Sequence, residues 1–186
     1  SSDLADAHND YANVLDQLGR RVEGLEHHAM AARLKPNDDA IGFNGAQALL
    51  AAGRAADAVA AFERVLQRQP DWVEAWLGLS DAWLRVNRPI EAAGALARAV
   101  RLRPMVAELH YNLGNIWWGL ARGPEAVAAL TEAVRLRPVI IWSIRTSRGR
   151  SPSVSVRILR SSRSPSRMTS RGKFGSSSSG KKARDA

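Results

Sequence analysis

The 186-residue chain contains no cysteine, which excludes disulfide bonds and thiolate metal sites. It has no apolar run long enough to span a bilayer as a helix. Residues 1–138 contain only three serines, Ser1, Ser2 and Ser80, and none of these lies in a nucleophile motif. A glycine-rich phosphate-binding loop is also missing. With no catalytic constellation in the sequence, we expect a protein that is not an enzyme and binds no cofactor.

Positive charge is unevenly distributed along the chain. Residues 1–138 contain 15 lysines and arginines against 17 acidic residues, whereas residues 139–186 contain 12 against a single acid, Asp185. The formal net charge of +9 therefore combines a near-neutral body with a basic tail. We place the boundary between these two parts near Pro138.

The body is organised by a repeated proline. Pro36, Pro70, Pro104 and Pro138 recur at a constant interval, and each one ends a pair of segments with helical spacing of apolar residues. This period predicts four helix–turn–helix repeats, over residues 5–36, 39–70, 73–104 and 107–138. One such helix pair cannot bury its own apolar face, so neighbouring pairs are expected to stack.

Residues within the repeats follow a fixed order of large and small side chains. The third repeat carries it at Trp76, Leu79, Ser80, Trp83, Ala92, Leu96 and Pro104, and the fourth at His110, Leu113, Gly114, Trp117, Ala126, Leu130 and Pro138. This order resembles the tetratricopeptide repeat (TPR) family. The resemblance implies an all-α fold, a right-handed superhelical solenoid of four helix–turn–helix pairs. It also implies that the first helix of each pair lines a concave groove in which peptides bind.

Three features of the repeats predict local structure. Turns are expected at Gly19–Arg20, Gly53–Arg54, Asn87–Arg88 and Gly123–Pro124. Pro89 is expected to open a helix at its first position, where its missing N–H does no harm. Trp83 is expected to fill the core.

Polar and aromatic residues of the first helices are the candidate binding residues. Those three or four positions apart share the face that the resemblance assigns to the groove. The candidates are Asn9, Asn13, Phe43, Asn44, Gln47, Asp81, Tyr111, Asn112, Asn115 and Trp118. A carboxamide can both donate to and accept from a peptide backbone, and an exposed aromatic can anchor a partner side chain.

The asparagines suggest a more specific comparison. Asn44 and Asn112 occupy equivalent sites two periods apart, which resembles the asparagine ladder in the TPR arm of O-linked N-acetylglucosamine transferases. Asp10 and Gly78 interrupt that ladder. The alternative is that these amides are ordinary polar residues facing water. For Trp118, the alternative is packing against a neighbouring helix or a fifth repeat.

The charge of the same face indicates the kind of partner. Acids outnumber bases on it, with Asp6, Asp10, Asp16, Glu74, Asp81 and Glu108 against Arg85. We therefore expect a protein or peptide partner that is neutral or basic. The TPR subclass that binds chaperone carboxyl termini needs cations where this chain has Asn9, Glu74 and Gly78, so that function is not expected.

Two adjacent histidines, His27 and His28, are the strongest candidate for a metal site. Adjacent residues on a helix point about 100° apart, and no second pair of ligands has suitable spacing. We therefore expect packing or solvated roles and no metal.

The tail, residues 139–186, contains 14 serines and follows no period. Its composition predicts disorder, and an out-of-frame translation is an alternative explanation. Val139–Ile144 could cover the apolar end of the fourth repeat. The tail's cations could hold RNA phosphates, but only Trp142 and Phe174 could stack on bases, so no specific nucleic-acid binding is expected.

These observations lead to a non-catalytic protein–protein interaction scaffold that binds an extended peptide or a partner helix in the concave groove. The alternative is the substrate-recruiting arm of a larger enzyme, similar to a glycosyltransferase, whose catalytic part lies elsewhere. We expect a cytoplasmic protein without a membrane span. Because the first residue is Ser1 rather than Met, we also expect a fragment or a processed product. The sequence does not indicate an oligomeric state.

Overall fold

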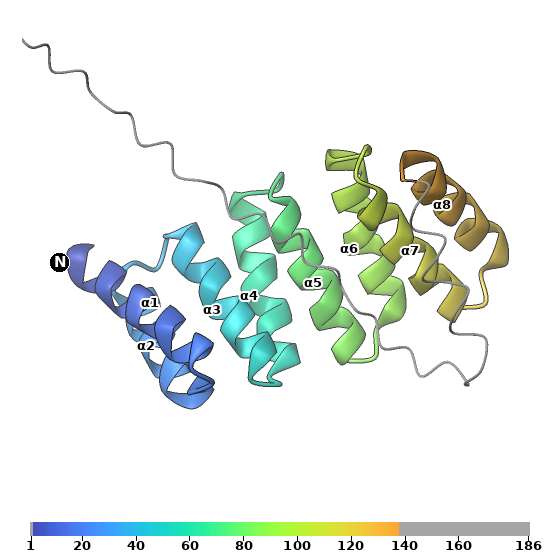
Figure 1. Cartoon of the computed structure of the whole chain (residues 1–186). Coiled ribbons are helices and arrows are strands. Elements are labelled where there is room, and N and C mark those ends of the chain that lie inside the picture. The colour runs from blue at the N-terminus through green and yellow to red at the C-terminus, as the bar shows by residue number, and fades with distance from the viewer. Residues whose placement is uncertain (1, 138–186) are drawn as a thin grey trace, which may run out of the picture.

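The computed structural model describes residues 2–137, which form eight α-helices. The helices are α1 (Ser2–Gln17), α2 (Arg21–Leu34), α3 (Asp39–Ala51), α4 (Ala55–Arg68), α5 (Val73–Arg85), α6 (Pro89–Leu102), α7 (Ala107–Gly119) and α8 (Gly123–Leu136). They pair into four antiparallel hairpins that stand side by side in one row (Figure 1). This arrangement confirms the expected all-α solenoid. The expectations for residues 138–186 lie outside the described residues.

Within a hairpin, small residues let the two backbones approach closely. The hydroxyl of Ser80 on α5 donates to the carbonyl of Ala92 on α6 at 3.0 Å. At the equivalent place in the fourth hairpin, a Cβ on Gly114 would lie 3.3 Å from the carbonyl oxygen of Ala126. The small side chains of the repeat pattern therefore mark the closest contact between the two helices of a pair.

Between hairpins, apolar side chains form two main cores. The first surrounds Phe62, which is fully buried, and joins the second hairpin to the third. The second surrounds Leu96 and Ile116 and joins the third hairpin to the fourth. Trp83, which the sequence placed in the core, is partly buried and packs against both cores. The third hairpin thus packs against the second and the fourth, and the burial of its apolar side chains depends on these two neighbours.

The turn inside each hairpin has one residue in the left-handed conformation, at Gly19, Gly53, Asn87 and Ala121. The next residue is always an arginine, whose N–H donates to the carbonyl five residues earlier at 2.8–2.9 Å. This bond closes the last turn of the first helix, as in a Schellman motif. Three of the four turns therefore lie where the sequence predicted them.

The fourth turn lies elsewhere, and the expected break at Gly123–Pro124 is wrong. Both residues belong to the first turn of α8, and the left-handed residue is Ala121, with a φ of 57°. A proline is tolerated in the first turn of a helix, because N–H groups there have no partner within the helix. The Gly–Pro pair thus marks the beginning of α8 and not the turn before it.

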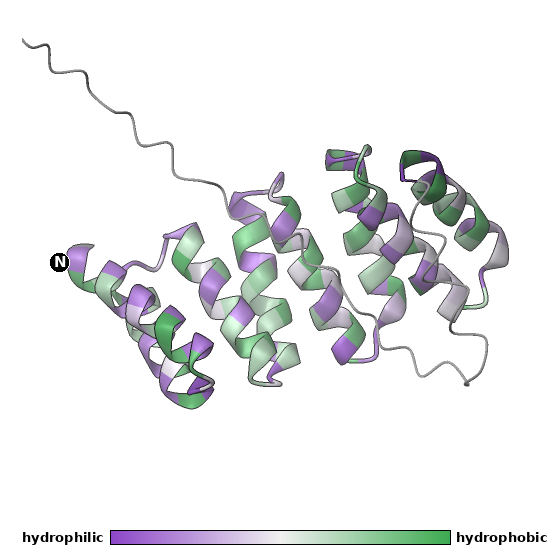
Figure 2. Ribbon diagram, in the orientation of Figure 1, coloured by the Kyte–Doolittle hydropathy of each residue, from purple (hydrophilic) through white to green (hydrophobic). Residues whose placement is uncertain are grey.

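Polar and apolar residues are interleaved along the helices, as Figure 2 shows, and this fits helices that are buried on one side only. Among residues 2–137, no helix is both long and apolar enough to cross a bilayer.

Candidate functional site

The first helices of the first three hairpins contact one another directly, since α3 touches both α1 and α5. Side chains also connect them. The side-chain amide nitrogen of Asn44 donates to the side-chain oxygen of Asn9 at 3.1 Å, and the Arg85 guanidinium lies 3.4 Å from the Leu50 carbonyl oxygen. We call the surface formed by the candidate residues of α1, α3, α5 and α7 the first-helix face. Its parts on α1, α3 and α5 are joined by these contacts.

Most of the predicted amides lie on this face with part of the side chain exposed. Asn9, Asn13, Asn44, Gln47 and Asn115 are all half-buried. Asn112 differs, because only 4% of it is exposed. Its amide is therefore poorly placed to meet a partner, and Asn115 is the accessible amide of α7.

The gap in the asparagine ladder at Gly78 has a steric cause. A Cβ placed on Gly78 would lie 2.4 Å and 2.5 Å from two ring carbons of Phe62, which comes from α4. Real Cβ contacts are almost never this short, and the Phe62 ring is fully buried. An asparagine therefore cannot replace Gly78 unless the core moves.

One of the three predicted aromatic anchors, Phe43, packs against other aromatic rings of the protein. The Phe43 ring stacks on Trp72 with a centroid distance of 4.6 Å and meets Phe62 edge-on at 5.9 Å. It belongs to the rim of the first core. Tyr111 is half-buried on α7. The Phe43 ring therefore packs beneath the first-helix face and is poorly placed to anchor a partner side chain.

Trp118 is the exposed aromatic, with 67% of its surface accessible. The equivalent residues of the two preceding hairpins are Leu50, which is 5% exposed, and Leu84, which packs against the second core. Both are covered by the hairpin that follows them. Within residues 2–137 no hairpin follows α8, so the exposure of Trp118 reflects its place at the end of the described row.

Ion pairs neutralise most of the acids that the sequence placed on this face. In every hairpin, an acid early in the first helix meets a cation at or just past the end of the second helix, always at the same separation along the chain. The pairs are Asp6–Lys35, Asp39–Arg68, Glu74–Arg103 and Glu108–Arg137. The hydrogen bond to Asp6 raises the pKa of Lys35. These pairs link the beginning of the first helix of each hairpin to the end of its second helix.

Two further acids of the face have basic neighbours. Asp81 lies 3.3 Å from Arg85, and Asp16 lies 3.1 Å from the ring of His28. Of the six predicted groove acids, four pair with a lysine or an arginine, Asp16 contacts a histidine ring, and Asp10 has no salt bridge within residues 2–137. The acidic surplus counted in the sequence therefore overstates the negative charge that a partner would meet.

A second series of ion pairs lies at the other end of each hairpin. The arginine that follows the left-handed residue pairs with the acid three positions later, in Arg20–Glu23, Arg54–Asp57, Arg88–Glu91 and Arg122–Glu125. The arginine hydrogen bond lowers the pKa of Glu23 and of Glu91. Sequence reasoning missed both series, although the constant spacing of their acids and cations along the chain was a readable signal.

The histidines of the first hairpin contact protein groups. The Nδ1 atoms of His8 and His27 lie 2.8 Å apart, and Tyr11 meets the His27 ring edge-on. His28 is 2% exposed and contacts Asp16. Residues 2–137 contain no cluster of three side chains suited to hold a metal ion. The contacts fit packing roles for these rings.

Two family models described as "Tetratricopeptide repeat" match the sequence, one over residues 49–105 and the other over residues 84–139. No curated protein sequence matches the chain.

Solved structures with a similar fold include MamA proteins and a thermophilic TPR protein. MamA 41-end from Desulfovibrio magneticus RS-1 is 19% identical, with a TM-score of 0.68 over 73% of this chain and 76% of that one. Another MamA crystal structure is 17% identical, with a TM-score of 0.71 over 77% and 78% of the two chains. TTC0263 from Thermus thermophilus is 22% identical, with a TM-score of 0.59 over 72% and 75%. At these identities the likeness concerns the fold.

Proposed function

The chain is a tetratricopeptide-repeat protein, and from that premise we propose that it is a non-catalytic scaffold that binds an extended peptide of a partner protein along its first-helix face. The observation that carries this proposal is the hydrogen bond between Asn44 and Asn9. It holds two amides from neighbouring hairpins side by side on a surface that is partly open to water.

The unused groups of this pair suit a peptide backbone. When the Asn44 amide donates to the Asn9 oxygen, Asn9 keeps its NH₂ group as a donor and Asn44 keeps its oxygen as an acceptor. Exchanging oxygen and nitrogen in both amides leaves the same two functions. One donor beside one acceptor matches the carbonyl and N–H that a peptide presents. Because the pair is already fixed by its own hydrogen bond, less entropy is lost when a peptide binds.

We propose that charge contributes less to peptide binding than the excess of acids in the sequence suggested. Since Asp6, Glu74 and Glu108 are already paired with cations, binding should depend mainly on backbone hydrogen bonds and only weakly on salt. The partner is then a neutral or mildly basic segment in extended form. Gln47 and Asn115 provide further half-exposed amides along the same face.

The proposal can be tested with a peptide selected from a randomised library on the full chain. Replacing Asn9 and Asn44 together by alanine should weaken binding of that peptide by about tenfold or more, as fluorescence anisotropy measures it. The matched control is Asn37→Ala, in an exposed loop between α2 and α3. Equal affinities of the wild type and the double variant, or an equal loss in the control, would reject the proposal.

The sequence-derived alternative, an arm of a larger enzyme, stays a prediction. Binding through the basic tail concerns residues outside the described part.

A further inference from the structure

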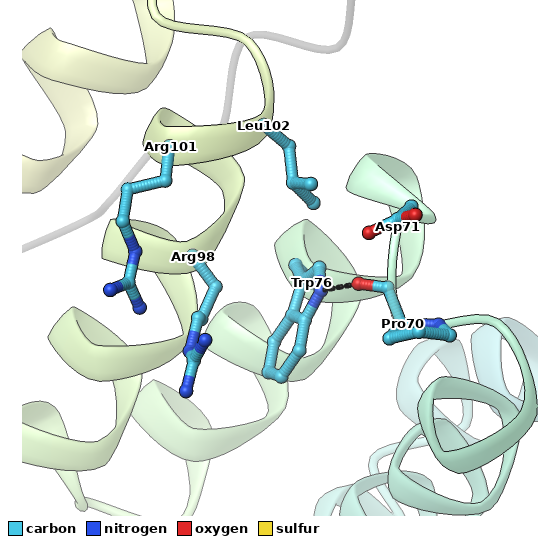
Figure 3. Close-up of a pocket in the computed structure, with 6 residues that line it drawn as sticks. All are labelled: Pro70, Asp71, Trp76, Arg98, Arg101 and Leu102. Carbon is cyan, nitrogen blue, oxygen red and sulfur yellow. Dashed lines mark hydrogen bonds between the residues drawn. The ribbon is translucent and has the colours of Figure 1, made fainter.

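A depression of about 450 Å³ lies at the edge of the third hairpin, where α5 begins and α6 ends. Its lining is formed by Pro70, Asp71, Trp76, Arg98, Arg101 and Leu102 (Figure 3). The indole N–H of Trp76 donates to the Pro70 carbonyl at 2.7 Å, which fixes the ring in this depression. None of these residues belongs to the first-helix face, so the depression is a separate surface.

Two arginines give the depression its charge. Arg98 and Arg101 stand three positions apart on α6, where like charges repel and reduce helix stability. Neither forms a salt bridge within the part of the chain that the structure describes. Asp71 is the one acid among the lining residues, and it lies on the other side of Trp76 from the arginines in Figure 3.

The next hairpin shows how this solenoid neutralises the same two positions. One period further on, Arg98 corresponds to Glu132 and Arg101 to Arg135. These two residues form an ion pair at 2.5 Å on α8. Trp76 corresponds to His110 in that hairpin. The third hairpin therefore combines two unneutralised guanidinium groups with a fixed tryptophan, and the fourth hairpin has neither feature.

We propose that this depression binds an acidic peptide segment of a partner protein, in which carboxylates lie next to an apolar side chain. The guanidinium groups of Arg98 and Arg101 bind the carboxylates, since their planar donor groups match carboxylate geometry. The apolar side chain packs on the Trp76 ring and Leu102. A volume of this size accommodates a few side chains and not a folded domain. Asp71 disfavours a multiply charged anion that fills the whole depression.

The test uses the peptide acetyl-Glu-Glu-Leu-Phe-amide and its neutral counterpart acetyl-Gln-Gln-Leu-Phe-amide, added to the ¹⁵N-labelled full chain. The indole N–H signal of Trp76, assigned with Trp76→Phe, reports binding. We expect the acidic peptide to shift this signal and the neutral peptide to bind at least about tenfold more weakly.

The informative variant is Arg98→Glu, which copies the Glu132–Arg135 arrangement and therefore keeps α6 stable. This variant should bind the acidic peptide at least about tenfold more weakly than the wild type does. Arg64→Glu is the matched control, because Arg64 is the exposed equivalent of Arg98 on α4 and the charge change is the same. It should leave the affinity within about twofold of the wild type.

Three outcomes would overturn the proposal. The first is an absent or equal response to the two peptides. The second is an equal loss of affinity in Arg98→Glu and Arg64→Glu, because that would show a general effect of net charge. The third is inorganic phosphate shifting the Trp76 signal at the same concentration as the acidic peptide, since the apolar part would then contribute nothing. None of these outcomes bears on peptide binding at Asn9 and Asn44.

Discussion

Replacing Gly78 by alanine gives the sharpest test of how α4 packs against α5. An alanine in the middle of a helix is about 1 kcal/mol more stable than a glycine when the site is open. At Gly78 the added Cβ would overlap the Phe62 ring at 2.4 Å, and that ring is fully buried. Overpacking of this kind costs about 1–3 kcal/mol, and an overlap this severe belongs at the upper end. We therefore expect Gly78→Ala to destabilise the protein by about 1–2 kcal/mol.

Gly94 is the matched control for this substitution. It lies inside α6, is exposed, and has no atom within 4 Å of the position that a Cβ would take. Gly94→Ala should therefore stabilise the protein by about 1 kcal/mol. The difference between the two variants, about 2–3 kcal/mol, isolates the steric effect because helix propensity contributes equally to both.

A double-mutant cycle then identifies the clashing partner. Phe62→Leu removes ring atoms from the place where the new Cβ would lie, and in that background Gly78→Ala should become neutral or stabilising. The coupling free energy should be about 2 kcal/mol, measured by urea unfolding of all four proteins. If Gly78→Ala stabilised the wild type as much as Gly94→Ala does, the contact between Phe62 and Gly78 would be refuted.

Three further predictions concern the core, a turn and an ion pair. Trp83→Ala should cost about 3–5 kcal/mol in chemical unfolding because Trp83 packs against both cores, and a change near zero would contradict that placement. Ala121→Gly should stabilise the protein by about 1 kcal/mol, because alanine is strained at a φ of 57°; an unchanged melting temperature would refute the left-handed turn. The hydrogen bond from Arg135 lowers the pKa of Glu132. The ionised Glu132 side chain therefore stabilises the folded protein fully above the ordinary glutamate pKa of about 4.3, and this stabilisation is lost as the pH falls through the lowered pKa. Thermal melts between pH 7 and pH 3 should therefore show a smaller pH dependence for Glu132→Gln than for the wild type; identical slopes would contradict this.

The repeat was readable from the sequence because it rests on local chemistry. Prolines at a constant spacing, helical spacing of apolar residues and left-handed turn residues are each set by neighbours in the chain. They predicted the stacked hairpins, the position of Pro89 and the packing of Trp83. The fourth turn was misplaced because Ala121 is an unusual left-handed residue, while the nearby Gly123–Pro124 pair is a stronger turn signal in most sequences.

The candidate site was less readable, because it depends on distances between hairpins. The sequence shows that Gly78 interrupts the asparagines, but not that the Phe62 ring from the preceding helix occupies the space. It shows the excess of acids on the first helices, but the cations that neutralise them lie far along the chain, at the ends of the second helices. The burial of Asn112 likewise follows from packing and not from its position in the period.

The most direct test of peptide binding on the first-helix face is to observe its side-chain amides by NMR. Addition of a library-selected peptide to the ¹⁵N-labelled chain should shift the NH₂ signals of Asn9, Asn44 and Asn115. The signals of Asn37 and Asn87, which lie in exposed connections between helices, should stay in place. If the peptide binds while the amides of Asn9 and Asn44 keep their signals, or if the two control residues shift equally, the peptide lies elsewhere and the account is wrong.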